Sequence, residues 1–476
     1  MLMNRKTKIV ATIGPATETK EMLSKIINTG VNVCRINFSH GTHEAHKKVI
    51  DNIREINQEQ GLFTAILADL QGPKIRVGKI KDNGVDIKNG DEIIISSEEC
   101  VGDAYKIYIS YQNFPQDVSP GEFILLDDGK LKLEIKSTNN IDEVIAIVRH
   151  GGVLKSNKGV NLPNTKISLP CLTQKDLVDL EFALKMNVAW IGLSFVRNAQ
   201  DILTLKQLIS NANSNAKVIA KVEKPEAIKD IDEIVAATDA IMVARGDLGV
   251  EIPFQEVPLV QKMIVKKSIR ASKPVIIATQ MMESMMDNIT PSRAEVNDVA
   301  NAVLDGADAV MLSGETSVGN FPVEVIDAMD KIINDVETDN RIYHYEYPPD
   351  ENILDRYITN SICFNSCRLA QRVLAKGIVT MTFSGYTAFK IASFRPKAGI
   401  YVFTGNEEIL NMLSLVWGVE VFLYNKFVST DHTIADIKHI LKKEKKLVQN
   451  DLIINIASMP IAEKGQSNMM KLSYIE

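Results

Sequence analysis

The sequence has few of the residue types that mark metal-binding or disulfide-rich proteins. Its 476 residues include five cysteines, seven histidines and two tryptophans, and no two cysteines have the CxxC spacing of a metal or redox site. We therefore expect reduced, mostly buried thiols rather than disulfides or metal ligands. These cysteines are Cys34, Cys100, Cys171, Cys363 and Cys367. The last two are four residues apart on a predicted helix, and core packing explains that spacing better than a metal site.

Long apolar runs and a strong net charge are also missing. No stretch approaches the length of a membrane span, and the N-terminal segment MLMNRKTKIVATIGPA leads into a predicted strand without the apolar core of a signal peptide. The net charge is -6, and the basic run at 442–446 is typical of a solvated helix face. We predict a cytoplasmic protein without a nucleic-acid or membrane partner. An anionic substrate would need a locally basic pocket.

What the sequence does contain is typical of a folded protein with several domains. Apolar residues make up 45% of the chain and charged residues 24%, which is usual for soluble globular proteins. A chain of 476 residues is too long for one ordinary domain, so we expect two to four.

Apolar stretches alternate with amphipathic stretches along much of the chain, which predicts a parallel α/β fold. Each predicted strand is followed by a predicted helix, and polar clusters such as RINFSH, SFVR, KVEK and ARGD follow nearly every strand. Because the loops after the strands of a (β/α)8 TIM barrel meet at one face, this pattern favours a barrel over a doubly wound open sheet, the alternative fold. The predicted strands are 8–13, 32–38, 63–70, 189–195, 218–223, 240–246, 274–280 and 309–314.

Two other segments depart from this alternation of strands and helices. Short alternating runs separated by DNG, KNG and DDG turn signals predict a small β domain inserted after the third strand. A linker containing Pro348 and Pro349 precedes a second α/β domain. The predicted division is 1–71 for the first part of the barrel, 72–168 for the inserted domain, 169–342 for the rest of the barrel and 343–476 for the C-terminal domain.

Charged residues at the ends of two neighbouring predicted strands mark the candidate site. Lys221 and Glu223 close one apolar run, and Asp247 follows the next. Charges at the end of a buried strand are costly unless they are paired or bind something. Two carboxylates brought together here would suit Mg2+, which keeps positions for water and substrate oxygens. The alternative is a structural salt bridge between Lys221 and one of the carboxylates.

Long motifs spread over the chain resemble those of the pyruvate kinase family. They are TKIVATIGPA, RINFSHGTHE, DLQGPKIR, NKGVNLP, KVEKPEAI, IMVARGDLGVEIP, PVIIATQMMESM, PSRAEVNDVANAVLDGADAVMLSGET and SGYTA. The resemblance implies a barrel, an inserted small β-barrel lid and a C-terminal α/β regulatory domain. It also implies transfer of the phosphoryl group of phosphoenolpyruvate to ADP, giving pyruvate and ATP.

The resemblance assigns roles at the strand ends. Glu223 and Asp247 would hold Mg2+, with Mn2+ as a second possible ion, and Lys221 would stabilise the transferring phosphoryl group. Arg35 would contact the phosphate of phosphoenolpyruvate. Arg35 could also pair with a neighbouring carboxylate such as Asp69, and the two roles are compatible.

The same resemblance places the substrate carboxylate and the proton donor. The backbone amides of Gly246 and Asp247, together with Thr279, would bind the carboxylate. Thr279 or the turn containing Ser313 and Glu315 would relay the proton to the enolate. The alternative for Thr279 is a hydroxyl group that only hydrogen-bonds the loop.

Five residues are implied in nucleotide binding. Arg76 and Lys158 would meet the nucleotide phosphates, Asn37 and His40 would lie near the same site, and Asp128 resembles a lid carboxylate. A structural role for His40 and a hairpin-turn role for Asp128 stay open, because a single loop histidine and a single turn aspartate are weak signals.

The monovalent-cation region departs from the common family pattern. The chain has Asn37, Ser39 and Asp69, but Leu70 and Lys74 stand in DLQGPKIR where many relatives have threonine and glutamate. This variant resembles the potassium-independent branch. We predict activity without K+, with the ammonium group of Lys74 replacing the ion. The alternative is that Lys74 points to solvent.

Regulation and assembly are implied less directly. Thr382, Ser384, Gly385 and Thr387 form a turn that suits a phosphorylated effector, although the neighbouring sequence does not favour fructose 1,6-bisphosphate. Residues 281–286 and 291–295 resemble the region of subunit contact in the family, which implies a homotetramer. Core packing is the alternative for the methionines of 281–286.

Two other functions compete with this assignment. A Mg2+-dependent aldolase or lyase on the same barrel would share the two carboxylates but would not need the lid, Arg76 or Lys158. A non-catalytic metabolite-binding protein would have no reason to keep Lys221 and Glu223.

Overall fold

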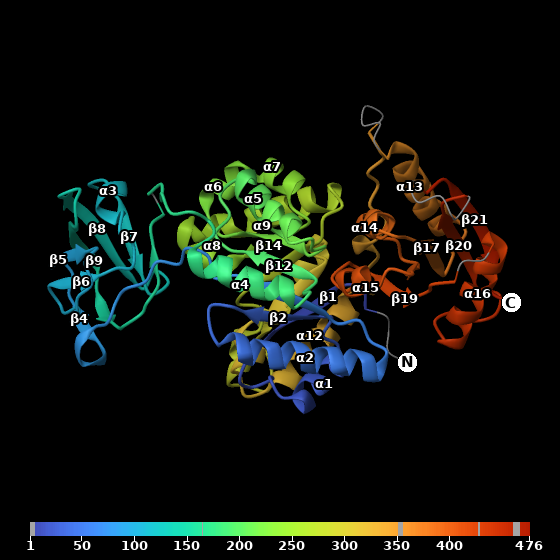
Figure 1. Ribbon diagram of the computed structural model, residues 1–476, viewed down its shortest axis with the longest axis horizontal. Helices are drawn as coiled ribbons and strands as arrows, with labels where there is room; N and C mark the ends of the chain where they lie inside the picture. Colours follow the sequence, from blue (N-terminus) through green and yellow to red (C-terminus); the bar gives the residue numbers. More distant parts are fainter. Residues whose placement is uncertain (1–4, 164, 351–355, 427–428, 460–466) are drawn as a thin grey trace.

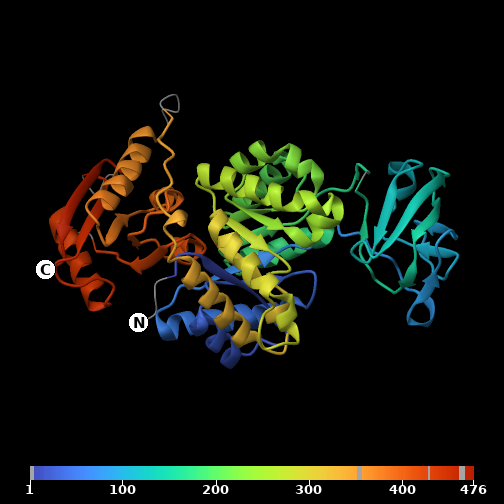
Figure 2. The ribbon, with the colours of Figure 1, turned by 180° about the vertical axis from the view of Figure 1, so that it is seen from behind.

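Three bodies lie in a row along the molecule. The computed structural model describes residues 5–163, 165–350, 356–426, 429–459 and 467–476. The barrel lies in the middle, with the inserted β domain at one end and the C-terminal domain at the other (Figure 1). Figure 2 shows the same order from behind. In the described part of the chain, no helix combines the length and the apolar character needed to cross a membrane.

The central body is a closed barrel of parallel strands. Each strand pairs with the next in the order β1, β2, β3, β12, β13, β14, β15 and β16, and β16 pairs with β1. This closure confirms the predicted barrel and excludes an open sheet. The strands are β1 (Lys8–Ile13), β2 (Val33–Asn37), β3 (Ala65–Asp69), β12 (Trp190–Leu193), β13 (Lys217–Val222), β14 (Ala240–Ala244), β15 (Val275–Ala278) and β16 (Ala309–Leu312).

The barrel helices begin at polar caps that the sequence supplies. The side chains of Thr19, Thr42 and Asn198 accept hydrogen bonds from amides of the first turn, and Thr173 and Ser292 form capping boxes. The outer helices are α1 (Lys20–Thr29), α2 (His43–Gln60), α4 (Gln174–Lys185), α5 (Ala199–Asn211), α9 (Val257–Arg270), α10 (Arg293–Asp305) and α12 (Pro322–Val336).

The connection between β13 and β14 differs from the single helix that the sequence predicts. It consists of two short helices, α6 (Pro225–Lys229) and α7 (Ile231–Ala237). They are separated at Asp230, whose dihedral angles (φ -98°, ψ 17°) are not helical. The predicted sixth strand is also shorter than expected, because α8 (Arg245–Glu251) begins directly after Ala244.

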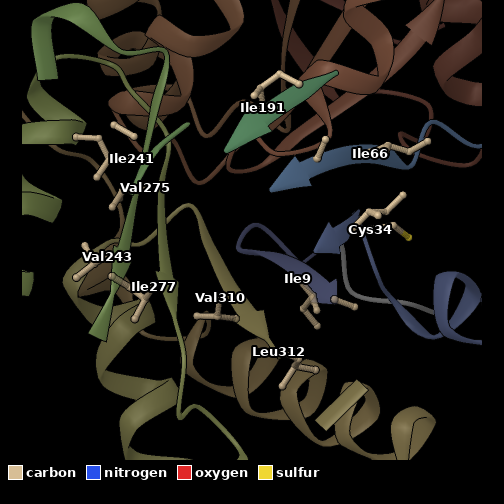
Figure 3. Packing of buried hydrophobic residues seen from close by; sticks show 14 of the residues in the cluster. Ile9, Cys34, Ile66, Ile191, Ile241, Val243, Val275, Ile277, Val310 and Leu312 are labelled. Atoms are coloured by element: carbon tan, nitrogen blue, oxygen red, sulfur yellow. The ribbon is translucent and has the colours of Figure 1, made fainter. Parts of the chain in front are cut away.

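Alternate residues of the barrel strands belong to two different cores. Residues such as Ile9, Ile66 and Ile241 lie in the cluster formed with the surrounding helices (Figure 3). Their neighbours, including Val10 and Met242, lie in a second cluster that continues into the C-terminal domain. The packed barrel interior is therefore continuous with the C-terminal domain, which leaves the opposite end of the barrel for a site.

The inserted domain, called the lid below (72–168), is built around one sheet. The strand order is β11 (Val160–Asn161), β7 (Phe123–Leu126), β8 (Leu131–Thr138), β9 (Glu143–His150), β5 (Glu92–Ser96) and β6 (Lys106–Tyr108). β4 (Val85–Ile87) and β10 (Gly152–Leu154) form a separate pair. Isolated bridges from Arg76 to Gly159 and from Val77 to Ile109 connect the two edges, so these bridges rather than a continuous ladder complete the predicted barrel.

The C-terminal domain is a five-stranded sheet flanked by helices. Its strands follow the order β19 (Val419–Leu423), β18 (Gly399–Thr404), β17 (Gly377–Met381), β20 (Leu452–Ala457) and β21 (Met469–Tyr474). β21 is an antiparallel edge strand that the sequence analysis missed. The helices are α13 (Tyr357–Arg372), α14 (Tyr386–Ser393), α15 (Glu407–Leu413) and α16 (Thr430–Lys443). Residues 351–355 and 460–466 of the predicted domain lie outside the described residues.

Candidate active site

Lys221 lies at the centre of a buried polar cluster at the carboxyl end of the barrel strands. Its Nζ atom is 2.7 Å from Ser194 Oγ, 3.0 Å from Glu223 Oε1 and 3.2 Å from Asp69 Oδ1. These partners follow or end β12, β13 and β3, which are neighbours in the barrel. The salt bridge given as the alternative for Lys221 is therefore present, and it fixes the ammonium group at the carboxyl ends of these strands.

Arg35 is the third residue of β2, and its side chain contacts the same carboxylate, that of Asp69, as Lys221. Its Nε donates to Asp69 Oδ2 at 2.6 Å, and its Nη1 donates to Thr12 Oγ1 at 2.9 Å. Asp69 is only 1% exposed. Asp69 thus orients both predicted phosphate-binding cations, and the pairing expected for Arg35 is confirmed.

Burial and neighbouring charges shift the pKa values of this cluster in a consistent way. Burial alone would lower the pKa of Lys221, but Asp69 and Glu223 together raise it above the usual lysine value. Burial opposes ionisation of Asp69, yet Lys221 and Arg35 lower its pKa overall. For Glu223, burial and the nearby Asp247 carboxylate raise the pKa despite Lys221. The pair Glu223 and Asp247 would therefore be stabilised by an additional cation.

The donor set between Glu223 and Asp247 fits a small hard cation. Glu223 Oε2 accepts a hydrogen bond of 2.7 Å from the Phe195 amide, which orients the carboxylate. Asp247 Oδ1 lies 3.3 Å from Lys74 Nζ. Across the described residues, no three His, Cys, Asp or Glu side chains form a metal-binding group. Two protein carboxylates with open positions for water and substrate oxygens match the preference of Mg2+.

Ser194 and Phe195 are site residues that the sequence analysis did not single out. Ser194 Oγ bonds Lys221 and donates to the Leu70 carbonyl at 2.7 Å, while the Phe195 amide holds Glu223. Phe195 has φ 55°, an unusual value for a bulky residue, which aims its amide at the carboxylate. The available signal was the polar cluster SFVR after the fourth predicted strand.

Thr279 is held in a strained conformation next to Gly246. Its φ is 69°, which is a marked outlier for a β-branched residue and is typical of functional sites. Thr279 Oγ1 accepts a hydrogen bond of 2.7 Å from the Gly246 amide, so the two predicted carboxylate-binding groups do lie together. Arg245 supports this loop because it donates to the Thr279 carbonyl at 2.8 Å and pairs with Asp298 at 2.7 Å.

Glu315 is buried, and its carboxylate accepts hydrogen bonds from two backbone amides. Its Oε1 accepts a hydrogen bond from the Met282 amide (3.1 Å) and its Oε2 accepts one from the Ser313 amide (2.7 Å). Both oxygens therefore tie together the loops after β15 and β16. This geometry gives Glu315 a positioning role. The Thr279 hydroxyl group donates to the Ala278 carbonyl at 2.6 Å, so the loop hydrogen bond given as the alternative for Thr279 is present.

The predicted nucleotide-binding residues of the lid gather around Gly159. Arg76 forms a bridge with Gly159, and Asp128 Oδ1 lies 4.0 Å from the position that a Cβ atom on Gly159 would occupy. Lys158 pairs with Asp127 at 2.8 Å rather than with Asp128. Within the described residues, no hydrogen bond or ion pair joins these lid groups to Asn37 or His40.

The barrel-side residues predicted for cation and nucleotide binding follow β2. Asn37 Oδ1 accepts a hydrogen bond of 3.1 Å from the Ser39 amide, and Asn37 is the register partner of Asp69. His40 is exposed on the same loop. Lys74 does not point simply to solvent, since its side chain is 31% exposed and its ion pair is with Asp247.

A second buried network, not foreseen from sequence, connects the lid to the barrel. Glu251 Oε1 lies 2.6 Å from Lys224 Nζ and accepts a hydrogen bond of 2.8 Å from Asn161 Nδ2. Asn161 belongs to the lid strand β11, and Lys224 directly follows the predicted metal ligand Glu223. The network anchors the end of the lid beside the candidate site.

The region predicted for effector binding is a compact turn before α14, and the region predicted for assembly contains the 3-10 helix Glu283–Met286 and the start of α10. Thr382 Oγ1 accepts a hydrogen bond of 3.0 Å from the Gly385 amide, and Thr387 lies in the first turn of α14. Met281, Met282 and Met285 are fully buried, so core packing accounts for these methionines. The described cysteines are free, and all except Cys100 are buried, as expected.

Comparison with known proteins agrees with this architecture. The family model for the pyruvate kinase barrel domain matches residues 4–326, and the model for the pyruvate kinase alpha/beta domain matches residues 360–473. A pyruvate kinase of Geobacillus stearothermophilus is 42% identical, over 99% of this chain and 81% of the relative. One from Staphylococcus aureus (strain MRSA252) is 41% identical, over 99% and 80%.

A solved structure gives the same result at the level of the fold. The crystal structure of a pyruvate kinase from Cryptosporidium parvum has a TM-score of 0.91 and 34% sequence identity, and the match covers 99% of this chain and 97% of that chain. Family models, sequence relatives and three-dimensional structure therefore agree over nearly the full length. The chain belongs to the pyruvate kinase family and is a phosphotransferase.

Proposed function

We propose that this protein transfers the phosphoryl group of phosphoenolpyruvate to ADP and releases pyruvate and ATP. The observation that carries the proposal is the buried ammonium group of Lys221, fixed within 3.2 Å of Ser194, Glu223 and Asp69 at the carboxyl ends of the barrel strands. A rigid cation at this position suits a reaction whose transition state spreads negative charge over phosphoryl oxygens.

Different groups around Lys221 bind the phosphate and the carboxylate of phosphoenolpyruvate. Arg35 contacts the phosphate from the opposite side of Asp69, and Lys221 faces the oxygens that carry charge during transfer. Thr279 and the amides of Gly246 and Asp247 receive the carboxylate. Because Asp69 already orients both cations, little reorganisation is needed when substrate arrives.

Glu223 and Asp247 would hold a divalent cation, Mg2+ or in its place Mn2+. When bound, it neutralises charge on the substrate oxygens. The raised pKa of Glu223, caused by burial and by Asp247, supports a cation at this position.

The hydroxyl group of Thr279 relays a proton from solvent to the enolate. It follows the end of β15, donates to the Ala278 carbonyl at 2.6 Å and accepts from the Gly246 amide, which places it next to the carboxylate-binding groups. Ser313 and Glu315 hold the neighbouring turn.

The nucleotide binds between the lid and the barrel. Arg76, Lys158 and Asp128 approach from the lid, and Asn37 and His40 from the loop after β2. Lys158 exchanges its pair with Asp127 for the nucleotide phosphates, which are stronger anions.

The enzyme works without K+. The support is the ion pair between Lys74 and Asp247, which places an ammonium group at the metal-binding carboxylate instead of in solvent. Asn37, Ser39 and Asp69 complete the region where relatives hold a monovalent cation.

We also propose allosteric regulation and a homotetramer. The turn of Thr382, Ser384, Gly385 and Thr387 suits a phosphorylated effector, since Ser384 is exposed and Gly385 opens α14. Ile289 (60% exposed) and Val296 (37%) flank the segment 291–295 and would be covered by another subunit.

The deciding experiment is an assay of pyruvate formation from phosphoenolpyruvate and ADP. It uses Mg2+ in a buffer free of K+ and Na+, followed by titration with K+ and by a control with excess chelator. Full activity without K+, abolished by the chelator, is expected. Activity that appears only with K+ would keep the reaction and overturn the role of Lys74. No activity in either buffer would overturn the proposed function.

A further inference from the structure

A cavity lies between the amino end of the barrel strands and the C-terminal domain, away from the candidate active site. Its volume is about 320 Å³, compared with about 30 Å³ for the cavity at the lid hinge. The first value is in the range of small-molecule sites. The residues that matter for the argument are Lys217, Lys273, Arg356, Lys390, Tyr386 and Phe389.

The cavity has more positive than negative charge. Asp239 is the acidic residue of its lining, and its carboxylate is already engaged, because Oδ1 is 2.9 Å from Lys206 Nζ and Oδ2 accepts the Val218 amide at 3.0 Å. Among the described residues, Lys217 has no ion pair. Lys390 Nζ donates to Ser272 Oγ at 3.3 Å and lies 5.2 Å from the centre of the Phe394 ring, and Lys273 Nζ donates to the Thr238 carbonyl at 2.6 Å. None of these partners carries a negative charge, so the lining of the cavity keeps an excess of positive charge.

These cations are partly buried rather than spread into solvent. Burial lowers the pKa of Lys273 and that of Lys390, and Lys206 and Lys217 oppose the effect of Asp239 on Lys273. Half-buried cations without matching carboxylates are unfavourable unless an anion joins them. The arrangement thus resembles a binding site more than a structural ion-pair network.

Two aromatic side chains complete the cavity. Tyr386 and Phe389 lie on the first turns of α14, and the Arg356 guanidinium stacks over the Tyr386 ring at 4.3 Å. The wall beside the cations is therefore partly apolar. It suits the organic part of a phosphate ester.

We propose that this cavity binds a small phosphate-bearing anion. The site shares Ser384 with the effector turn, but its four cations come from outside that turn, from the barrel, α14 and the residue preceding α13. Lys217 begins the strand that ends with Lys221 and Val222, so the cavity and the active site lie at opposite ends of β13. Binding here does not depend on the proposed reaction.

The test is calorimetric titration of the full-length protein with inorganic phosphate and with phenyl phosphate. Every protein carries Arg35→Gln, which removes a phosphate contact at the other end of the barrel. Lys217→Glu and Lys390→Gln are compared with Lys376→Glu, an exposed lysine outside the cavity. Circular dichroism and the thermal midpoint check folding, and Lys390→Gln carries the test if the charge reversal does not fold.

We expect roughly tenfold weaker binding in the two cavity variants, as for loss of one charged contact, and unchanged binding in Lys376→Glu. Tighter binding of phenyl phosphate than of inorganic phosphate assigns the site to phosphate esters, and equal binding assigns it to free phosphate. Absence of binding by either probe, or the same loss in Lys376→Glu, overturns the proposal. Since the readout is binding, it is independent of whether phosphoryl transfer is observed.

Discussion

At the scale of single residues, the chemistry depends on how a few buried charges are paired. Lys221 and Arg35 both contact Asp69, and each has one additional hydroxyl partner, Ser194 or Thr12. Although burial lowers the pKa of Lys221, Asp69 and Glu223 raise it above the usual lysine value, so the group is protonated at neutral pH. The cluster is therefore prepared for an anion before substrate binds.

Replacing Lys221 tests whether activity depends on this prepositioned positive charge. We expect Lys221→Met to lower kcat by about 100- to 1,000-fold, since one preorganised charge at the phosphoryl group is lost. Steady-state kinetics with phosphoenolpyruvate and ADP measure the effect. Lys217→Met, at the other end of the same strand, is the control and should lose far less activity. Equal losses would mean that Lys221 acts through stability alone.

Lys74 allows a sharper test of the monovalent-cation prediction. Lys74→Glu removes the ammonium group and adds a carboxylate near Asp247, so we expect activity without K+ to fall by about tenfold or more and to recover on addition of K+. The measurement is kcat at several K+ concentrations. Lys79→Glu, an exposed lid lysine, is the matched control. A Lys74→Glu enzyme that is active without K+ would contradict the assignment.

At the scale of secondary-structure elements, close packing between neighbouring strands positions the cluster. Gly192 of β12 faces Asp69 of β3, and a Cβ atom on Gly192 would lie 2.9 Å from Asp69 Oδ1. The absence of a side chain at Gly192 leaves room for the carboxylate that holds Arg35 and Lys221.

Gly192→Ala should therefore reduce activity through geometry rather than through unfolding. We expect kcat to fall by roughly tenfold or more, because small displacements of catalytic groups are costly. Kinetics and the thermal midpoint should be measured together. Gly249→Ala on α8 is the control, since its added methyl group would meet only Val257 at 3.7 Å. Normal activity in Gly192→Ala would show that Asp69 tolerates displacement.

At the scale of the whole molecule, the C-terminal domain closes one end of the barrel through buried polar contacts. Arg395 pairs with Asp308 at 2.9 Å, and Trp190 Nε1 donates to the Met412 carbonyl at 3.2 Å. Lys6 and Lys8 donate to the carbonyls of Ala398 and Val419, both at 2.8 Å. The C-terminal domain is therefore in direct contact with the barrel strands.

The two buried lysines predict a pH dependence of stability. Burial lowers the pKa of Lys6 and that of Lys8 to about 8, while both are near 10.5 in the unfolded chain. Between these values the unfolded state binds more protons, so stability rises with pH. We expect a gain of about 1 kcal/mol per lysine between about pH 7.5 and pH 9.

Urea unfolding followed by tryptophan fluorescence measures this gain. Trp190 and Trp417 are both buried in the core that the barrel shares with the C-terminal domain. Lys8→Met should roughly halve the dependence on pH. A dependence that is unchanged in Lys8→Met, or stability that falls over this range, would contradict the prediction.

The sequence by itself determined the fold class and the main charges of the site. Apolar periodicity is a local property, so strands such as Lys8–Ile13 and Val33–Asn37 could be located from it. In a parallel barrel every strand ends at the same face. Lys221, Glu223 and Asp247 were therefore expected to meet once the strands were assigned, whereas the role of Arg35 came from the resemblance to the family.

Only the tertiary structure decided which groups hold these charges in place. Ser194, the Phe195 amide and Gly192 contact or make room for side chains of neighbouring strands. Arg245 fixes the loop in which Thr279 is strained. Lys158 pairs with Asp127 instead of Asp128. The basic cavity likewise combines Lys217, Lys273, Arg356 and Lys390, which are far apart in the chain. These contacts depend on distances between elements, and spacing along the chain does not encode such distances.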